Sequence, residues 1–510
     1  MKKLFFTTKT LSLFLMATAC VLIMSCSDDD GTSAPIVDMP APAPNASFTA
    51  LTSDNKIVYY NAQNLNAPTA TLNVSGLQTA ETLLSIDYRP ATGQLYALGS
   101  SSRLYLINEQ SGLATALGMA PFTPAIASQN ASIDFNPTVD RIRLVTDSGQ
   151  NLRLHPELGT VVATDGNING GMNPQIGAVA YTNSVAGASS TMLYDIDFAQ
   201  DKLYIQMPPN DGGLQEVGDL TVDFMGVGGF DIIADNSVAL AVVKNDTDSR
   251  LYTINLETAK AVWVGTFNLM VKSLAIKTNP IAYATSADNK LFRFNPMSPM
   301  MNSVDLIGLS NGETVVGLDF RPVNGALYAI TNQSRLLTVN TANGQVTAIG
   351  SALMPALSGT SFGFDFNPTV DRIRLVSNTG QNLRLHPDLG TVVFTDGMLN
   401  PGTPNVNSGA YDNNFASSTA TTLYVIDSEN DMMYRQIPPN AGTLVQVGPL
   451  GVNIEAENGF DVGGASNMAF GLLKSNNMTA VYRLNLTNGA ATKVADFNIN
   501  ATAMAVGLGF

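Results

Sequence analysis

Two matching sets of polar side chains are the residues of this sequence best suited to binding or chemistry. Each set combines three arginines with one asparagine and one of the chain's 2 histidines. Guanidinium groups form paired hydrogen bonds with carboxylates and phosphates, so such a set could bind an anionic group such as a uronate or a phosphate. The two candidate ligand-binding sets are Arg141, Arg143, Asn151, Arg153 and His155, and Arg372, Arg374, Asn382, Arg384 and His386.

The pairing register of two short strands decides whether the members of a set lie together. Side chains alternate between the two faces of a strand, so Arg141 and Arg143 share one face of the first strand. By the same rule Asn151, Arg153 and His155 share one face of the next strand. The turn between the strands therefore determines whether the two faces coincide.

Two turns are compatible with the sequence between these strands. A two-residue turn at 148–149 places Arg143 opposite Leu154 and puts the cations on opposite faces, whereas a three-residue loop at 147–149 places Arg143 opposite Arg153. Opposed like charges are unfavourable unless an anion or a carboxylate lies between them. We therefore favour the two-residue turn, with each arginine paired to a carboxylate such as Asp134, Asp140 or Asp165.

Metal binding through the histidines is disfavoured by the number of ligands. Zinc sites use three or four protein ligands, yet each half of the chain offers one histidine, and both cysteines, Cys20 and Cys26, lie near the N-terminus. For His155 and His386, each at the end of a strand, we favour a hydrogen bond to a neighbouring four-stranded unit.

Six aspartates recur at corresponding places and form a second candidate site. They could bind Ca²⁺ or another hard cation through carboxylate oxygens, or each could accept backbone N–H bonds in the turn that follows it. We favour the structural role, so no cofactor is predicted and Ca²⁺ stays open. The aspartates are Asp87, Asp134, Asp231, Asp319, Asp365 and Asp461, of which Asp87, Asp134, Asp319 and Asp365 are the metal candidates.

The elements that must position these residues are short β-strands in a repeated order. Residues 134–166 recur at 365–397 with 28 of 33 positions identical, so the chain is a tandem duplication. Within each half, short runs of apolar, β-branched and aromatic residues alternate with turns that contain Gly, Asn, Asp or Pro, which predicts strands. The strands fall into units of four, with five units in each half.

Four-stranded units of roughly 40 to 45 residues are typical of propeller blades. The sequence thus predicts an all-β fold, a β-propeller of about ten four-stranded blades. We favour a single closed ring over two tandem five-bladed propellers, because the link between the halves is two or three residues long and spans only roughly 10 Å. Residues 47–278 then form the first half and 279–510 the second, with the C-terminal strand closing the first blade.

The N-terminus has the features of a bacterial lipoprotein. Residues 1–25 combine early lysines with an apolar run typical of an export signal, and residues 23–26, Ile-Met-Ser-Cys, resemble a lipobox that would be lipidated at Cys26. The acidic residues 27–30 resemble the export signal of Bacteroidetes-type lipoproteins. Residues 26–46, acidic and then rich in Pro and Ala, are expected to be an extended tether. We therefore expect anchoring in the outer membrane through the N-terminal lipid, on the cell surface.

The charge balance argues against a nucleic-acid partner. Removal of residues 1–25 would take away three lysines and no acidic residue, so the formal net charge would change from −15 to −18. A surface of this sign repels nucleic acid.

Several motifs together resemble one bacterial family, the domain of unknown function 4394. They are IDYRPATGQLYAL at 86–98, DFNPTVDRIRLV at 134–145, GQNLRLHP at 149–156, and the Pro-Pro-Asn loops at 208–210 and 438–440. The resemblance covers both halves, essentially residues 47–510. It implies an exported, propeller-like protein and supplies no catalytic residues.

The function favoured by these features is a non-catalytic binding or scaffold module for a glycan or an envelope protein. One alternative is a propeller enzyme, a glycan hydrolase or lyase that uses the paired carboxylates of the recurring aspartates. Another is an architectural component of the cell envelope.

Overall fold

The computed structural model describes residues 40–224 and 226–510 of the chain. The predicted signal at 1–25, the lipidation site Cys26 and most of the predicted tether lie outside these residues. The described part contains ten four-stranded antiparallel sheets, so the predicted all-β fold with ten four-stranded blades is confirmed. No helix in the described part has the length and apolar character that a membrane span requires.

The first five sheets, called the first propeller below, contain β1 to β20. Their strands, sheet by sheet, are β1 (Ser47–Thr52), β2 (Lys56–Asn61), β3 (Ala70–Asn73) and β20 (Val271–Ala275); β4 (Leu83–Tyr88), β5 (Leu95–Gly99), β6 (Arg103–Ile107) and β7 (Ala114–Ala116); β8 (Ala131–Asn136), β9 (Arg141–Thr146), β10 (Asn151–Leu154) and β11 (Val161–Thr164); β12 (Ile176–Tyr181), β13 (Leu193–Asp197), β14 (Lys202–Gln206) and β15 (Leu214–Asp219); β16 (Val227–Ile232), β17 (Ala239–Lys244), β18 (Ser249–Ile254) and β19 (Ala261–Thr266).

The other five sheets, called the second propeller, contain β21 to β40. Their strands are β21 (Ala282–Ser286), β22 (Lys290–Phe294), β23 (Met301–Asp305) and β40 (Ala501–Val506); β24 (Val315–Phe320), β25 (Leu327–Thr331), β26 (Leu336–Val339) and β27 (Val346–Ile349); β28 (Phe362–Asn367), β29 (Arg372–Ser377), β30 (Asn382–His386) and β31 (Thr391–Thr395); β32 (Val406–Tyr411), β33 (Leu423–Asp427), β34 (Met432–Gln436) and β35 (Leu444–Pro449); β36 (Gly459–Val462), β37 (Ala469–Ser475), β38 (Met478–Leu484) and β39 (Ala491–Asp496).

In each propeller, one short 3-10 turn follows the third strand of the fourth blade. The two turns are η1 (Pro209–Asp211) and η2 (Pro439–Ala441), and they hold the Pro-Pro-Asn loops. Each turn ends on a glycine in the left-handed conformation, Gly212 at φ 71° and Gly442 at φ 67°. The repeated loop therefore has the same backbone shape in both copies.

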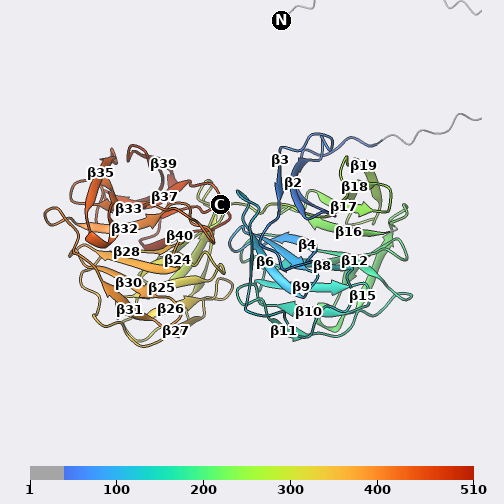
Figure 1. Ribbon diagram of the computed structural model, residues 1–510, viewed down its shortest axis with the longest axis horizontal. Coiled ribbons are helices and arrows are strands. Elements are labelled where there is room, and N and C mark those ends of the chain that lie inside the picture. The colour runs from blue at the N-terminus through green and yellow to red at the C-terminus, as the bar shows by residue number, and fades with distance from the viewer. Residues whose placement is uncertain (1–39, 225) are drawn as a thin grey trace, which may run out of the picture. The chain divides into compact units, whose positions relative to one another are not determined.

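Each half of the chain closes on itself through its own last strand. β20 pairs with β1, and β40 pairs with β21. The inner strands of the first propeller contact one another in the circuit β4, β8, β12, β16 and β20, and those of the second in the circuit β24, β28, β32, β36 and β40. In Figure 1 the strands of the two halves accordingly form two separate groups.

The favoured single ring of ten blades is therefore wrong, and the alternative of two tandem five-bladed propellers is correct. The C-terminal strand β40 completes the first blade of the second propeller instead of the first blade of the chain. The link between the rings is longer than the two or three residues expected, because the flanking strands are shorter than the sequence indicates. β20 ends at Ala275 and β21 begins at Ala282, so residues 276–281 connect the rings, enough for roughly 20 Å of extended chain.

The hydrophobic core lies between neighbouring blades. Side chains that point to one face of a blade pack against the next blade, as where Tyr96 of β5 meets Phe135 of β8 with ring centroids 4.9 Å apart. The corresponding pair in the second propeller, Tyr328 and Phe366, lies at 5.0 Å. Both sheet faces are thus buried, which explains why most inner and middle strands are buried at nearly every position.

The last residues of the predicted tether belong to the first propeller. The N–H of Ala41 donates to the carbonyl of Trp263 at 2.9 Å, and Ala46 is buried in the cluster that contains Phe48. The boundary predicted at residue 46 is therefore too late, because alanines next to the first strand can pack on apolar side chains even in a Pro-rich segment.

Deletion of residues 501–510 should open the second propeller and leave the first closed. The deletion removes β40, so β21 loses its inner partner, whereas β1 keeps β20. In hydrogen exchange with mass spectrometry, we expect protection to be lost in 282–496 and retained in 47–275. Loss of protection in β1 (Ser47–Thr52) would contradict the two-ring closure.

Candidate functional site

The register of the third blade differs from the one favoured from the sequence. Arg143 lies directly opposite Arg153, and in the second propeller Arg374 lies opposite Arg384. The loop is therefore the three-residue one, and the predicted two-residue turn is wrong. The like charges tolerate this register because a carboxylate lies between them.

That carboxylate is Asp165. Its Oδ2 accepts from Arg143 Nη1 at 2.6 Å and from Arg153 Nε at 2.8 Å, and its Oδ1 accepts from Arg153 Nη2 at 2.9 Å. In the second propeller Asp396 binds Arg374 and Arg384 with distances that agree within 0.1 Å. The anion that the arginine pair requires is thus supplied by the chain itself.

The rest of the arginine network ties the third blade to the fourth. Arg143 Nη1 donates to Asn151 at 2.8 Å, and Arg143 Nη2 donates to Asn210 of the Pro-Pro-Asn loop at 2.8 Å. Asn151 Nδ2 donates to the carbonyl of Pro209 at 2.9 Å. The corresponding bonds recur in the second propeller, with Arg374, Asn382, Pro439 and Asn440. These residues therefore hold two blades together. This explains why the Pro-Pro-Asn loop and the segment 134–166 both recur in the second half of the chain.

Arg141 and His155 lie outside this network. Arg141 Nη1 donates to the carbonyl of Asp140 at 2.8 Å, and His155 Nδ1 accepts from the N–H of Glu157 at 3.2 Å. Burial, together with the charges of Arg141 and Arg89, lowers the pKa of His155 to about 4, so this histidine is neutral at pH 7. The same hydrogen bonds occur in the second propeller, where Arg372 Nη1 donates to the carbonyl of Asp371 and His386 Nδ1 accepts from the N–H of Asp388.

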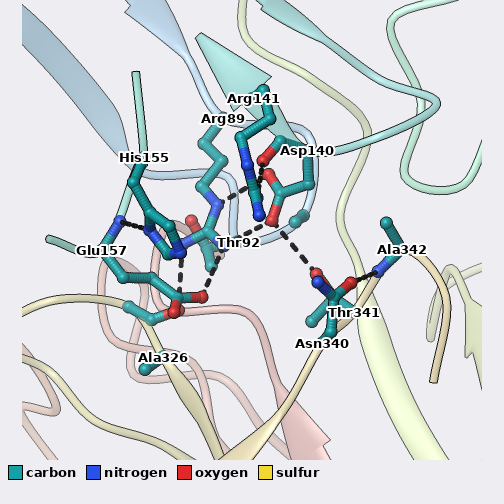
Figure 2. A network of polar contacts seen from close by, with 12 residues as sticks. Arg89, Thr92, Asp140, Arg141, His155, Glu157, Ala326, Asn340, Thr341 and Ala342 are labelled. Atoms are coloured by element: carbon teal, nitrogen blue, oxygen red, sulfur yellow. Dashed lines mark hydrogen bonds and ion pairs between the residues drawn. The ribbon is translucent and has the colours of Figure 1, made fainter. Parts of the chain in front are cut away.

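A neighbouring network that the sequence did not single out joins the two propellers. Arg89 is fully buried; its Nε donates to Asp140 at 2.9 Å and its Nη2 to Glu157 at 2.9 Å. Its Nη1 reaches the carbonyl of Gly325 in the second propeller at 3.0 Å, and Thr341 Oγ1 donates to Asp140 at 3.1 Å. Figure 2 shows Arg89 between the two carboxylates, with Thr341 on the far side of Asp140. The sequence signal that could have identified this network is the Arg-Pro pair at residues 89–90, which recurs at residues 321–322.

The six recurring aspartates gather into two buried triads, one in each propeller. Within a triad, carboxylate oxygens of all three residues lie within 4.8 Å of one another. The triads are Asp87, Asp134 and Asp231, and Asp319, Asp365 and Asp461. The four metal candidates therefore do not form one site, and each pair of them gains a third carboxylate from the fifth blade.

Each aspartate of the first triad accepts a backbone N–H from the next blade. Asp87 Oδ2 accepts from Phe135 at 2.7 Å, and Asp134 Oδ1 accepts from Tyr181 at 3.0 Å. Asp231 Oδ2 accepts from Ile276 at 2.5 Å. Asp87 and Asp231 also accept the N–H of the residue that follows each of them, Tyr88 at 2.7 Å and Ile232 at 2.6 Å. The aspartates thus bond both to the next blade, which the favoured structural role did not include, and to the strand end before the turn.

Burial and mutual repulsion raise the pKa values of these carboxyl groups. Desolvation raises the pKa of Asp231 to about 7, and the pKa values of Asp87 and Asp134 are also raised well above the usual range, first by desolvation and then by the neighbouring carboxylates. A divalent cation could replace the protons, because oxygen ligands in such a group suit Ca²⁺. Ca²⁺ binding at the triads stays a prediction.

A pocket of about 230 Å³ opens at the other end of the inner strands of the first propeller. Its lining comes from the starts of the inner strands of all five blades and from the loops before them. We call it the mouth pocket; its polar residues include Gln129, Asn130, Asp147, Gln175, Lys244 and Lys272. Asp147 accepts from Asn130 Nδ2 at 2.8 Å.

The two lysines of the mouth pocket have no carboxylate partner among the described residues. Lys244 Nζ donates only to the carbonyl of Asn245, at 3.2 Å, and Lys272 makes no ion pair. Desolvation, and then the charge of Lys244, lowers the pKa of Lys272 to about 8. The pocket therefore holds two cations close enough to repel each other.

In the second propeller, the lysine at the corresponding position is paired with carboxylates. Lys474, which corresponds to Lys244, lies 3.3 Å from Glu455 Oε2 and 3.5 Å from Glu457 Oε2. Thr502 stands where the first propeller has Lys272, and it hydrogen-bonds Thr285 at 2.9 Å. The unpaired lysines thus occur in the first propeller only, and the repeated blade structure does not require them.

Both halves of the chain match one family model, as the motifs predicted. The model is described as Domain of unknown function (DUF4394), and it matches residues 56–275 and 290–507. A search of curated proteins finds no match.

Two solved structures are similar to the chain at low identity. One is described as the structure of the Dos1 propeller; it is 12% identical with a TM-score of 0.24, and the match covers 66% of this chain and 92% of that chain. The other is PorZ, a bacterial surface component of the type-IX secretion system of Porphyromonas gingivalis. It is 12% identical with a TM-score of 0.26, and the match covers 90% of this chain and 61% of that chain.

Arg143→Ala should destabilise the first propeller far more than Arg153→Ala. The Arg143 side chain is 3% exposed, so its loss breaks a buried ion pair and should cost roughly 3–5 kcal/mol. The Arg153 side chain is 34% exposed, and its loss should cost about 1 kcal/mol or less. Urea unfolding followed through the fluorescence of Trp263, the chain's 1 tryptophan, measures both. Equal losses would contradict the ranking.

The aspartate triads should make the protein less stable as pH rises from 4 to 7. The pKa of Asp231 is about 7 in the folded chain against 3.8 for the free group, so the folded state holds more protons in this window and loses that stabilisation as they leave. Asp134→Asn keeps an acceptor for Tyr181 and removes one charge, so its melting temperature should fall less between pH 5 and pH 8.

The exposed Asp235→Asn serves as the control for this series, since it should follow the wild type. A fall of the same size in Asp134→Asn and in the wild type would refute the effect of the triad. Addition of Ca²⁺ at pH 8 tests the cation prediction, because a bound ion would raise the melting temperature of the wild type more than that of Asp134→Asn.

Proposed function

The chain belongs to the family described as Domain of unknown function (DUF4394), and since that description assigns no activity, we propose its function from the geometry of the chain. The protein is a lipid-anchored, non-catalytic binding module of the outer membrane. It binds an acidic glycan in the mouth pocket of the first propeller.

The observation that carries the proposal is the pair of unpaired lysines, Lys244 and Lys272. Two partly buried cations without a carboxylate repel each other, and an anion between them would remove that repulsion. The second propeller, built from the same repeat, supplies carboxylates to Lys474 and has no second lysine. A fold requirement would appear in both copies, so a ligand is the better explanation.

The other polar groups of the mouth pocket suit a sugar. The amides of Gln129 and Gln175 can donate to and accept from hydroxyl groups, and the Asp147 carboxylate can accept from them. A uronic acid offers both chemistries in one ring, with a carboxylate for the lysines and hydroxyls for the amides and Asp147. This favours an acidic glycan over an envelope protein as the partner.

The channel carboxylates support the enzyme alternative less well. A glycosidase needs two carboxyl groups that reach the scissile bond. The triad members are buried, and Asp87, Asp134 and Asp231 use oxygens to accept N–H groups from the next blade. We therefore assign them to the frame of the propeller.

The anchoring part of the proposal rests on the sequence. Cys26 in its lipobox-like context and the acidic residues 27–30 support a lipid anchor and surface exposure. Metabolic labelling with an alkyne fatty acid tests it: wild type should be labelled and Cys26→Ala should not.

Lys272→Ala should abolish most of the binding of an acidic oligosaccharide. In calorimetric titration with tetragalacturonate, loss of one charged hydrogen bond should weaken binding roughly 10- to 100-fold, and Lys474→Ala in the second propeller is the matched control that should change nothing. Because the pKa of Lys272 is about 8, wild-type affinity should fall as pH rises from 7 to 9. The proposal fails if tetragalacturonate does not bind, or if Lys272→Ala binds it as the wild type does.

A further inference from the structure

A second pocket lies where the chain passes from the first propeller to the second. It has a volume of about 460 Å³ and takes its lining from both propellers and from the link between them. Val185 and Ala186 come from the first propeller, residues 278–281 from the link, and Arg293 with six residues between 294 and 302 from the second propeller. We call it the junction pocket, and it is separate from the mouth pocket.

Two buried polar groups of the junction pocket lack a partner in the described chain. Arg293 is 4% exposed, its Nε has no hydrogen-bond acceptor, and it takes part in none of the ion pairs of the described residues. Thr278 is 8% exposed, and its Oγ1 is also without a partner. A buried cation without a counter-charge costs several kcal/mol. Burial accordingly lowers the pKa of Arg293.

The surroundings of Arg293 offer no hidden counter-charge. It lies on β22 opposite Tyr283 of β21, and the Tyr283 hydroxyl donates to the carbonyl of Ala91 at 3.0 Å. The other charged group on β22 is Lys290, which pairs with Asp305 at 2.6 Å. Every residue of the pocket lining except Arg293 is uncharged.

Arg293 is specific to one copy of the repeat, and so is the space that receives it. Tyr59, opposite Thr49, occupies the corresponding place in the first propeller. A Cβ added to Gly187 would lie 1.4 Å from Arg293 Nη1, so the guanidinium rests on the bare face of this glycine. Ser417 occupies the equivalent place in the second propeller with a similar backbone, φ 62° against 68°. The turn thus accepts a residue other than glycine in the second copy, and Arg293 adds a steric reason for glycine at position 187.

The walls of the pocket are mainly apolar. Ile281 and Phe294 are buried beside Arg293, and Met300 and Met301 are exposed at the same pocket. Methionine side chains adapt to irregular apolar partners. A ligand of this pocket therefore needs an apolar body as well as an anionic group.

We propose that the junction pocket binds a carboxylate at the end of an apolar chain, with the carboxylate on Arg293 and Thr278 and the chain along Ile281, Phe294 and the two methionines. A guanidinium pairs with a carboxylate through two parallel hydrogen bonds, and the Thr278 hydroxyl can donate a third. A volume of about 460 Å³ accommodates a small molecule of this kind. The apolar walls distinguish this ligand from the hydroxyl-rich sugar proposed for the mouth pocket.

The test is calorimetric titration of the full-length protein with decanoate and with decanol. Decanoate should bind, and decanol should bind at least 10-fold more weakly, because it lacks the charge. A second arm compares the peptide acetyl-Leu-Leu-Leu with its C-terminal amide, which separates a fatty acid from a peptide C-terminus as the source of the carboxylate. Absence of binding by both carboxylates, or equal binding of each to its uncharged counterpart, would overturn the proposal.

Two variants assign the binding to the pocket. Arg293→Met keeps the shape of the side chain and should weaken decanoate binding roughly 10- to 100-fold, and it should not lower the melting temperature, since it removes an unpaired buried charge. Gly187→Ser keeps a backbone that the second copy accepts and displaces the guanidinium, so it should also weaken binding.

Lys290→Met on the same strand is the matched control and should bind decanoate like the wild type. Retained affinity in Arg293→Met and Gly187→Ser would show that decanoate binds elsewhere and would overturn the proposal. The mouth pocket is tested independently by tetragalacturonate, which Arg293→Met should bind normally.

Discussion

Both propellers depend on hydrogen bonds that a buried side chain of one blade accepts from the inner strand of the next. An inner strand is the edge of its sheet, so part of its N–H groups lack a strand partner, and a buried N–H without an acceptor is costly. Asp87, Asp134 and Asp231 supply acceptors in the first propeller, and Ser85 adds one to Ile133 at 3.2 Å. Because five blades converge, the carboxylates meet, and burial together with their mutual repulsion raises their pKa values. The carboxylates that accept hydrogen bonds between blades thus form an arrangement that resembles a metal site.

The near-identical third blade follows from the same kind of demand. Its register opposes two arginines, and Asp165 makes that register stable by binding both. Asn151 and the Pro-Pro-Asn loop complete the network, so a change at one position would leave a buried partner unsatisfied. In both copies these groups are used inside the protein, and the residues that first looked like a binding site are part of the frame.

The differences between the copies, and not their shared residues, mark the candidate binding sites. Comparison of the two copies separates structural groups from others, since a group that the blade structure requires should occur in both propellers. Lys272 and Arg293 occur once, at places where the other copy has Thr502 and Tyr59, and each is a partly or wholly buried cation without a carboxylate. Natural chains seldom keep such a charge without a compensating partner.

The strands, their grouping in fours and the duplication can be predicted from the sequence alone, because alternation, turn residues and repeats are local properties of the chain. The same is true of the recurrence of Asp87 and its five counterparts. The strand that closes each ring, the turn that joins β9 to β10 and the cations that stay unpaired are visible only in the folded protein. These features depend on contacts between residues that are separated in the chain. Asp165 accepts hydrogen bonds from both Arg143 and Arg153 and so offsets their repulsion, and β20 pairs with β1. Single-strand patterns carry no information about such partners, so electrostatic balance and ring closure became visible only in the folded protein.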